Sequence, residues 1–343
     1  MKTKIIISIC ATLIIIILGI AIGSVYVPPL NIINIMGSKI FGLPLNENIA
    51  KTTVSILWNL RLPRALLAFI VGAALSVSGA VMQSVLKNPL ASSYTLGVSS
   101  GASLGAGFVI LLGITIPFAR MLTLPIFGFA FGLGTIFTAI SFAARIDGRM
   151  ENNTIILTGM VFSLFTNAVI TIMSAMSKEH MQRLIYWQMG SFSMKDWISV
   201  FILAPVIIAG ILFVLRYNRE LDIMTFGEEQ AQSIGVNLKK TKWTLLVLSA
   251  ALTGSAIAFV GVIGFVDLVA PHIVRKIFGS PHIYVIPMSA VFGGAFMVLC
   301  DLAARIVLTG QELPVGAVTA LIGAPFFAYI YFSRRPNKNA KTQ

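Results

Sequence analysis

The amino-acid sequence predicts an all-helical polytopic membrane protein of about ten transmembrane helices, in one domain that covers residues 1–343. Three observations support this fold class. The mean hydropathy is +0.91, and hydrophobic residues make up 57% of the chain. Charged residues make up only 11%, whereas soluble domains carry about 25%. The apolar residues also fall into long runs that short polar connections separate.

The predicted spans follow from these runs, because a transmembrane helix needs about 20 apolar residues. In chain order they lie near residues 5–26, 62–86, 94–114, 121–144, 154–176, 196–215, 243–263, 265–278, 283–303 and 314–332. The first run is too long for the apolar region of a signal peptide and is interpreted as a transmembrane helix. The eighth is the least regular, because Asp267, Pro271 and His272 interrupt it.

Two connections are long enough to fold by themselves. Residues 177–195 are amphipathic, and a short surface helix is expected there. Residues 216–242 form the longest polar stretch, with a helix start at Glu228 and a glycine stop at Gly235. A compact cytoplasmic helical pair is expected at about 221–240. Lys and Arg are more frequent on this side, the tail after Ser333 included, which predicts a multi-pass protein of the cell membrane with both termini cytoplasmic.

The sequence carries no motif for catalysis. It has no GxxxxGK[ST] phosphate-binding loop, and its three histidines have no neighbours at metal-ligand spacing. Cys10 and Cys300 lie in apolar runs and are expected to be buried. The net charge of +13 is assigned to membrane topology rather than to nucleic-acid binding. We therefore predict a non-catalytic protein without cofactor or metal, which needs a partner or an ion gradient for energy.

One segment indicates a pathway. Residues 61–106 hold two apolar helices around a polar turn that Pro89 interrupts. Such an interruption is tolerated in a membrane only where it lines a water-filled path or packs against protein. Farther along, Gly101 and Gly105 form a GxxxG pattern, interpreted as packing within the chain, with a dimer contact as the alternative.

Four motifs identify a family resemblance. They are RLPR at 61–64, GAVMQSVLKNPLASSYTLGVSSGA at 79–102, GVIGFVDLVAPHIVR at 261–275 and ELPVGAVTALIGAPFF at 312–327. In this order they resemble the FecCD-type permeases, the transmembrane subunits of type II ABC importers for iron-siderophores, cobalamin and haem. The resemblance implies ten helices per subunit and two permease subunits, identical or related. It also implies two cytoplasmic ATPase subunits and an extracytoplasmic substrate-binding protein.

The resemblance also assigns roles at the two ends of the path. Arg61, Arg64 and Arg305 are expected on the exposed outer side, where they would receive acidic residues of the binding protein. The alternatives are anchoring at lipid head groups for Arg61 and Arg64, and pairing with Asp301 for Arg305. The turn of Asn88, Pro89 and Leu90 matches the cytoplasmic gate, with a plain turn as its alternative. A second gate element is expected near residues 152–154.

Further roles concern coupling and the path wall. The residues that would seat in the ATPase are Phe226, Gly227, Glu228, Glu229, Gln230 and Gly235. The glycines would set the turns, and the three polar residues between them would face the ATPase. The fifth span would line the path through Met160, Asn167, Thr171, Met173 and Met176, with helix packing as the alternative.

The predicted function is the import of an iron-siderophore. Cobalamin and haem remain alternatives, and no histidine is expected deep in the path to favour haem. A second class is an ion-coupled secondary transporter that uses Asp267 or Asp301 as a proton relay. A third is a membrane sensor without transport. For Asp267 there is a further alternative, in which Arg275 or a water-filled cavity compensates the charge of its carboxylate.

Overall fold

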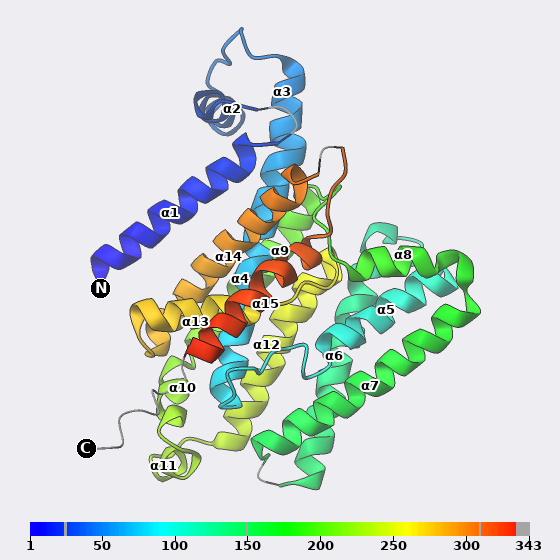
Figure 1. Cartoon of the computed structure of the whole chain (residues 1–343), viewed down its shortest axis with the longest axis vertical. Coiled ribbons are helices and arrows are strands. Elements are labelled where there is room, and N and C mark those ends of the chain that lie inside the picture. Colours follow the sequence, from blue (N-terminus) through cyan, green and yellow to red (C-terminus); the bar gives the residue numbers. More distant parts are fainter. Residues whose placement is uncertain (24–25, 149, 309, 334–343) are drawn as a thin grey trace.

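The computed structural model describes residues 1–23, 26–148, 150–308 and 310–333, and every regular element in these residues is a helix (Figure 1). The tail after Ser333 and Arg149 lie outside the described residues. The helices are α1 (Lys2–Ala21), α2 (Pro29–Phe41), α3 (Lys51–Ser55), η1 (Ile56–Arg61), α4 (Leu62–Val85), α5 (Val98–Leu112), α6 (Arg120–Ile146), α7 (Asn152–Met176), α8 (Lys178–Gln188), α9 (Trp197–Leu215), α10 (Asn218–Thr225), α11 (Glu228–Ser233), α12 (Leu238–Val260), α13 (Val266–Phe278), α14 (His282–Ile306) and α15 (Val315–Ser333).

The all-helical membrane fold is confirmed. Among the described residues, seven helices are long and apolar enough to cross a membrane, one of them the continuous run of α3, η1 and α4 over Lys51–Val85. The shorter apolar helices α5 and α15 and the 13-residue α13 occupy the remaining predicted spans. The predicted start of the second span, at residue 62, is wrong. The helix begins at Lys51 and continues through one π-helical turn, η1, into α4.

Helix α4 is the centre of the bundle and packs against α14, α12, α13 and α9. Small residues permit this close packing. A Cβ atom at Gly72 would collide with the carbonyl oxygen of Gly293 on α14, and one at Gly79 with that of Asp267 on α13. The glycines of the GxxxG pattern likewise permit close packing of α5 on α6, because Cβ atoms at Gly101 or Gly105 would collide with the backbone of α6. The interpretation of that pair as packing within the chain is confirmed.

Short helices extend the bundle at both of its ends. At one end, which we call the α3 end, lie α2, α3 and the loop residues 307–308 and 310–314, and Figure 1 shows α2 nearly end-on beside α3. At the other, the α11 end, lie α10, α11, the last turn of α4 and the first turn of α7 (Figure 1). The surface helix expected within 177–195 is α8, and the expected helical pair is α10 and α11. Cys300 is buried as expected, but Cys10 is exposed on α1.

Candidate functional site

The three arginines of the docking prediction lie together at the α3 end, in what we call the arginine cluster. Arg64, in the first turn of α4, holds the Asp301 carboxylate of α14 with N–O distances of 2.8 and 2.9 Å. Its second terminal nitrogen lies 2.8 Å from Glu312 of the loop before α15. Arg305 reaches the same Asp301 at 3.2 Å, one helical turn away. The pairing of Arg305 with Asp301, which the sequence offered as the alternative to docking, is thus present, and Arg64 joins it.

Arg61 completes the cluster by closing the end of α1. Its guanidinium donates to the carbonyl oxygens of Ile20 and Ala21 at 3.2 and 3.1 Å. Arg305 donates likewise to Gly19 at 2.8 Å. These are the carbonyls that a helix leaves without partners at its C-terminus, so the arginines satisfy them and oppose the negative end of the helix dipole.

The expected exposure of these arginines is wrong. Arg61 is 8% exposed, and the side chains of Arg64 and Arg305 are 12% and 9% exposed. For Arg64 and Arg305 the reason is the carboxylate of Asp301, 1% exposed, which both guanidinium groups contact, and Arg61 is buried against the end of α1. A buried carboxylate needs such partners.

A hollow of about 460 Å³ opens over the cluster, lined by all three arginines and by Glu312. Glu312 is 43% exposed at this opening. Partial burial opposes its ionisation, but the hydrogen bond and the charge of Arg64 outweigh that effect and lower the pKa of Glu312. The cluster contains three guanidinium groups and two carboxylates, a net charge of +1. Its hollow therefore favours one further anion.

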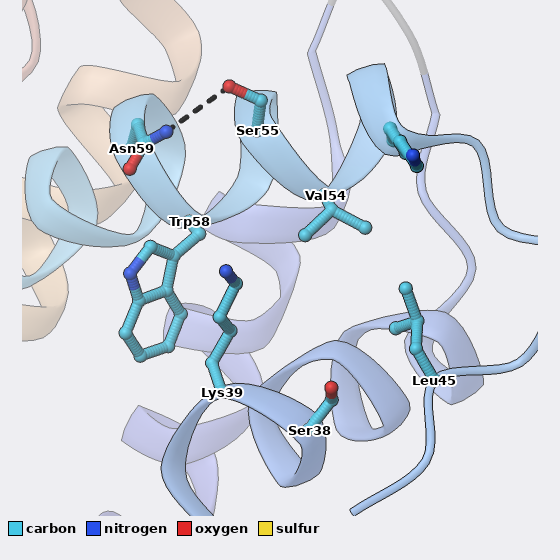
Figure 2. Close-up of a pocket in the computed structure, with 8 residues that line it drawn as sticks. Ser38, Lys39, Leu45, Val54, Ser55, Trp58 and Asn59 are labelled. Atoms are coloured by element: carbon cyan, nitrogen blue, oxygen red, sulfur yellow. Dashed lines mark hydrogen bonds between the residues drawn. The ribbon is translucent and has the colours of Figure 1, made fainter. Parts of the chain in front are cut away.

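A second hollow of about 460 Å³, which was not predicted from the sequence, lies between α2 and α3 (Figure 2). Its walls carry Lys39 from the last turn of α2, Lys51 from α3 and the ring of Trp58. Asn59 donates to the hydroxyl of Ser55 at 3.1 Å, the bond that Figure 2 marks. Both lysines are exposed, and within the described part of the chain neither pairs with a carboxylate. This hollow is also cationic.

The predicted gate turn follows the last turn of α4, at the α11 end. Asn88 accepts a bond from the amide of Leu90 at 2.9 Å, which closes the turn, and Pro89 and Leu90 are exposed. The chain then returns into the bundle in irregular form, where Leu96 packs against Gly159 of α7. Ser92 and Thr95 satisfy each other's backbone there. Irregular backbone at this depth is permitted because protein surrounds it.

The predicted coupling helices differ in one respect from expectation. Phe226 is 80% exposed, and Gly227 and Gly235 have the positive φ angles of 141° and 94° that form the turns. Glu229 and Gln230 are exposed, as a partner-facing role requires. Glu228 does not simply face outward, because its carboxylate lies 2.8 Å from the buried ammonium of Lys242.

The predicted path residues lie on a helix with few neighbours. Met160, Asn167, Thr171 and Met176 of α7 are exposed in the single chain. Met173 is not, because it packs into a small cluster around Leu184 of α8. Four of the five are therefore exposed on α7, and Met173 packs against α8.

Asp267 is buried at the first turn of α13, and Arg275 does not satisfy it. Arg275 donates to Gln83, Ser84 and the carbonyl of Ala80 on α4. In the part of the chain that the structure describes, Asp267 Oδ2 has no hydrogen-bond partner.

Comparisons with known proteins cover nearly the whole chain. The profile of the FecCD transport family matches residues 11–333. An uncharacterized ABC transporter permease protein of Bacillus subtilis, YvrB, is 41% identical over 92% of this chain and 89% of its own. The cobalamin import permease BtuC of Halobacterium salinarum is 37% identical, covering 86% and 78%. A solved metal-chelate type ABC transporter, in an inward-facing conformation, superimposes with a TM-score of 0.83 at 26% identity, over 97% of this chain and all of that one.

Proposed function

Because this chain belongs to the FecCD transport family and is a non-catalytic permease subunit of an ABC importer, we propose that it carries an iron-siderophore across the cell membrane. Importers of this kind combine a dimeric permease with ATPases and a binding protein. The α3 end then faces the outside, and the α11 end and both termini face the cytoplasm.

The observation that carries this proposal is that α4 joins both parts of the expected machinery. The arginine cluster lies at its first turn and the gate turn directly after its last. Binding-protein docking belongs at the arginine cluster, whose net charge of +1 favours an entering carboxylate. Such a carboxylate can take the place of Glu312 on Arg64, because Glu312 is the exposed member of the cluster.

The lysines of the second hollow extend this docking surface. Unlike the arginines, Lys39 and Lys51 offer charge that no described carboxylate neutralises. Exposed charges of this kind steer an acidic partner and raise its association rate.

Cargo would pass along the open face of α7 toward the gate at Leu90, with a second permease subunit opposite. The methionine and polar side chains exposed on α7 suit a bulky polar chelate held without tight binding. Cobalamin and haem are the competing cargoes, since relatives named for the import of vitamin B12 and hemin also match this chain. The relatives named for Fe(3+)-citrate import match it to a similar degree.

Uptake into vesicles tests the function. The permease, its ATPase and its binding protein are reconstituted together, and internal ⁵⁵Fe-siderophore, cobalamin and haemin are measured with ATP inside. We expect accumulation of the iron chelate alone, and only with ATP and binding protein. Accumulation of cobalamin or haemin instead would refute the iron-siderophore assignment and identify that compound as the cargo. Accumulation driven by a proton gradient without ATP would refute an ABC mechanism.

Docking is tested separately by the affinity of the binding protein for the full chain. K39E/K51E should weaken binding in a salt-dependent way. R120E/R183E is the matched control, because these two exposed arginines lie on the expected outer side but away from either hollow. Equal losses in both variants would indicate a general effect of charge and refute docking at α2 and α3.

A further inference from the structure

Lys242 of α12 is fully buried, with a side-chain exposure of 0%. Its ammonium has three partners at the α11 end, one from α11 and two from the segment that begins α7. They are the Glu228 carboxylate of α11 at 2.8 Å, the Asn152 side-chain oxygen at the first residue of α7 at 2.9 Å, and the Met150 carbonyl at 3.0 Å.

This arrangement uses the whole bonding capacity of the ammonium. A lysine carries three N–H donors and no acceptor, so three partners satisfy it completely. Burial of a charge is unfavourable unless it is paired and fully hydrogen-bonded. The ammonium of Lys242 therefore holds its three partners in place. Moving any of them away breaks a charge-assisted hydrogen bond in a site of low dielectric constant.

The backbone before α7 is shaped around this contact. Met150 has a φ of 54°, a left-handed conformation that residues with a side chain seldom adopt. Its side chain is buried, and its amide donates to the carbonyl of Asp147 at 3.0 Å. The bend delivers the Met150 carbonyl to Lys242 and lets α7 begin at Asn152 beside it.

The neighbouring helix α10 is attached elsewhere. Asp222 of α10 contacts the His282 ring at 2.6 Å, and that ring contacts Ser84 of α4 at 2.7 Å. The two helices of the pair are therefore attached to different parts of the bundle. Helix α10 is bonded through His282 to α14 and α4, at the centre of the bundle. Helix α11 is bonded through Lys242 to α7.

We propose that Lys242 is a positioning residue that transmits a displacement of α11 to the first turn of α7, and so couples the ATPase to the helix that lines the path. The proposal rests on the proposed function for its two end points, α11 as the ATPase contact and α7 as the path wall. The contact itself is independent of cargo. Glu228 acts here from the inner face of α11, while Glu229 and Gln230 remain exposed for the ATPase.

The first test compares coupling in K242M and K240M within the full importer. Methionine is similar in length to lysine but has no charge, and Lys240 is an exposed lysine on the same helix. In K242M we expect nearly unchanged ATP hydrolysis and a loss of transport per ATP of at least about tenfold, because one charge-assisted hydrogen bond already corresponds to about that factor and the variant removes three. K240M should behave as wild type. A parallel fall of hydrolysis and transport in K242M would show a stabilising role only and would overturn the proposal.

The second test needs nucleotide and ATPase but no cargo, so its result is separate from the fate of the proposed function. Spin labels replace the exposed Asn153 of α7 and Ser233 of α11, and their separation is measured with and without ATP. In the otherwise wild-type chain the separation should stay constant, because the two elements move together. In K242M it should change with nucleotide. If K242M does not fold, E228A, which removes one partner of the ammonium and leaves two, serves instead. A separation that stays constant in the variant, or varies in the wild type, would overturn the proposal.

Discussion

Replacement of Asp301 by asparagine should destabilise the protein more than any other single change at the α3 end. The Asp301 carboxylate is 1% exposed and lies 2.8 Å from a nitrogen of Arg64 and 3.2 Å from one of Arg305. At an effective dielectric constant of about 20, two unit charges 4 Å apart attract by about 4 kcal/mol. Asparagine keeps the shape but removes this attraction for two buried guanidinium groups. Arg64 retains Glu312, so we expect a net loss of about 3–5 kcal/mol.

The assay is reversible unfolding of the purified chain in mixed detergent and SDS micelles. E312Q is the control, because it removes a carboxylate from the same arginine at an exposed position, where an ion pair contributes about 0–1 kcal/mol. The triple variant R64M/D301L/R305M should regain part of the loss, since an apolar replacement leaves no buried charge unpaired. If D301N lost no more stability than E312Q, the idea that Asp301 organises the cluster would be refuted.

Three further predictions concern separate parts of the molecule. G79L should abolish folding, seen as loss of the monodisperse peak in size exclusion, because a Cβ there collides with the Asp267 carbonyl; G134L, in open space, should fold. T253V should cost about 1–3 kcal/mol in the same unfolding assay, because the Thr253 hydroxyl bonds the buried hydroxyls of Ser78 and Ser93 at 2.8 Å; equal stability would contradict this. The lowered pKa of Glu312 means that its ion pair stabilises the folded state above the ordinary carboxyl value of 4.5 and is lost as pH falls through the folded pKa. The stability difference between wild type and E312Q should therefore shrink as the pH falls below 4.5, and a difference that does not change with pH in this acid range would refute the assignment.

The membrane fold could be predicted from the sequence because long apolar runs have few other solutions in a bilayer. Helix α2 could not. Its apolar residues are mixed with Asn31, Asn34 and Lys39, and it is shorter than a span. The outward extension of α4 was missed for the same reason, since Lys51 and Asn59 interrupt the hydropathy of that stretch.

Residues in the candidate site were found where a motif named them, but their environment was not. The motif RLPR does not show whether its arginines are exposed or paired. The carboxylate that pairs with Arg64 in the buried cluster belongs to Asp301, 237 residues away in the chain. Lys242 gave a weak signal that could have been used, because it stands one residue before a predicted span and was assigned only to topology. Its partner Asn152 is 90 residues distant, so only the folded chain brings the two together.

The distribution of these contacts separates a fixed part of the subunit from a part that can move. Buried residues make up 83% of the apolar window of the α3–α4 helix but only 28% of that of α7. Arg64 fastens the first turn of α4 to α14, and the contacts of Ser84 with His282 and Arg275 fasten its last turn to α14 and α13. Helix α7 packs on α5, α6 and α8, and Lys242 joins its first turn to α11. A displacement of α11 is therefore expected to move α7, which is loosely packed, more than α4, which is held rigidly by its neighbours. The turn at Pro89, which we propose as the gate, belongs to the rigid side, so we expect opening to occur by movement of α7 away from it rather than by unfolding of the turn.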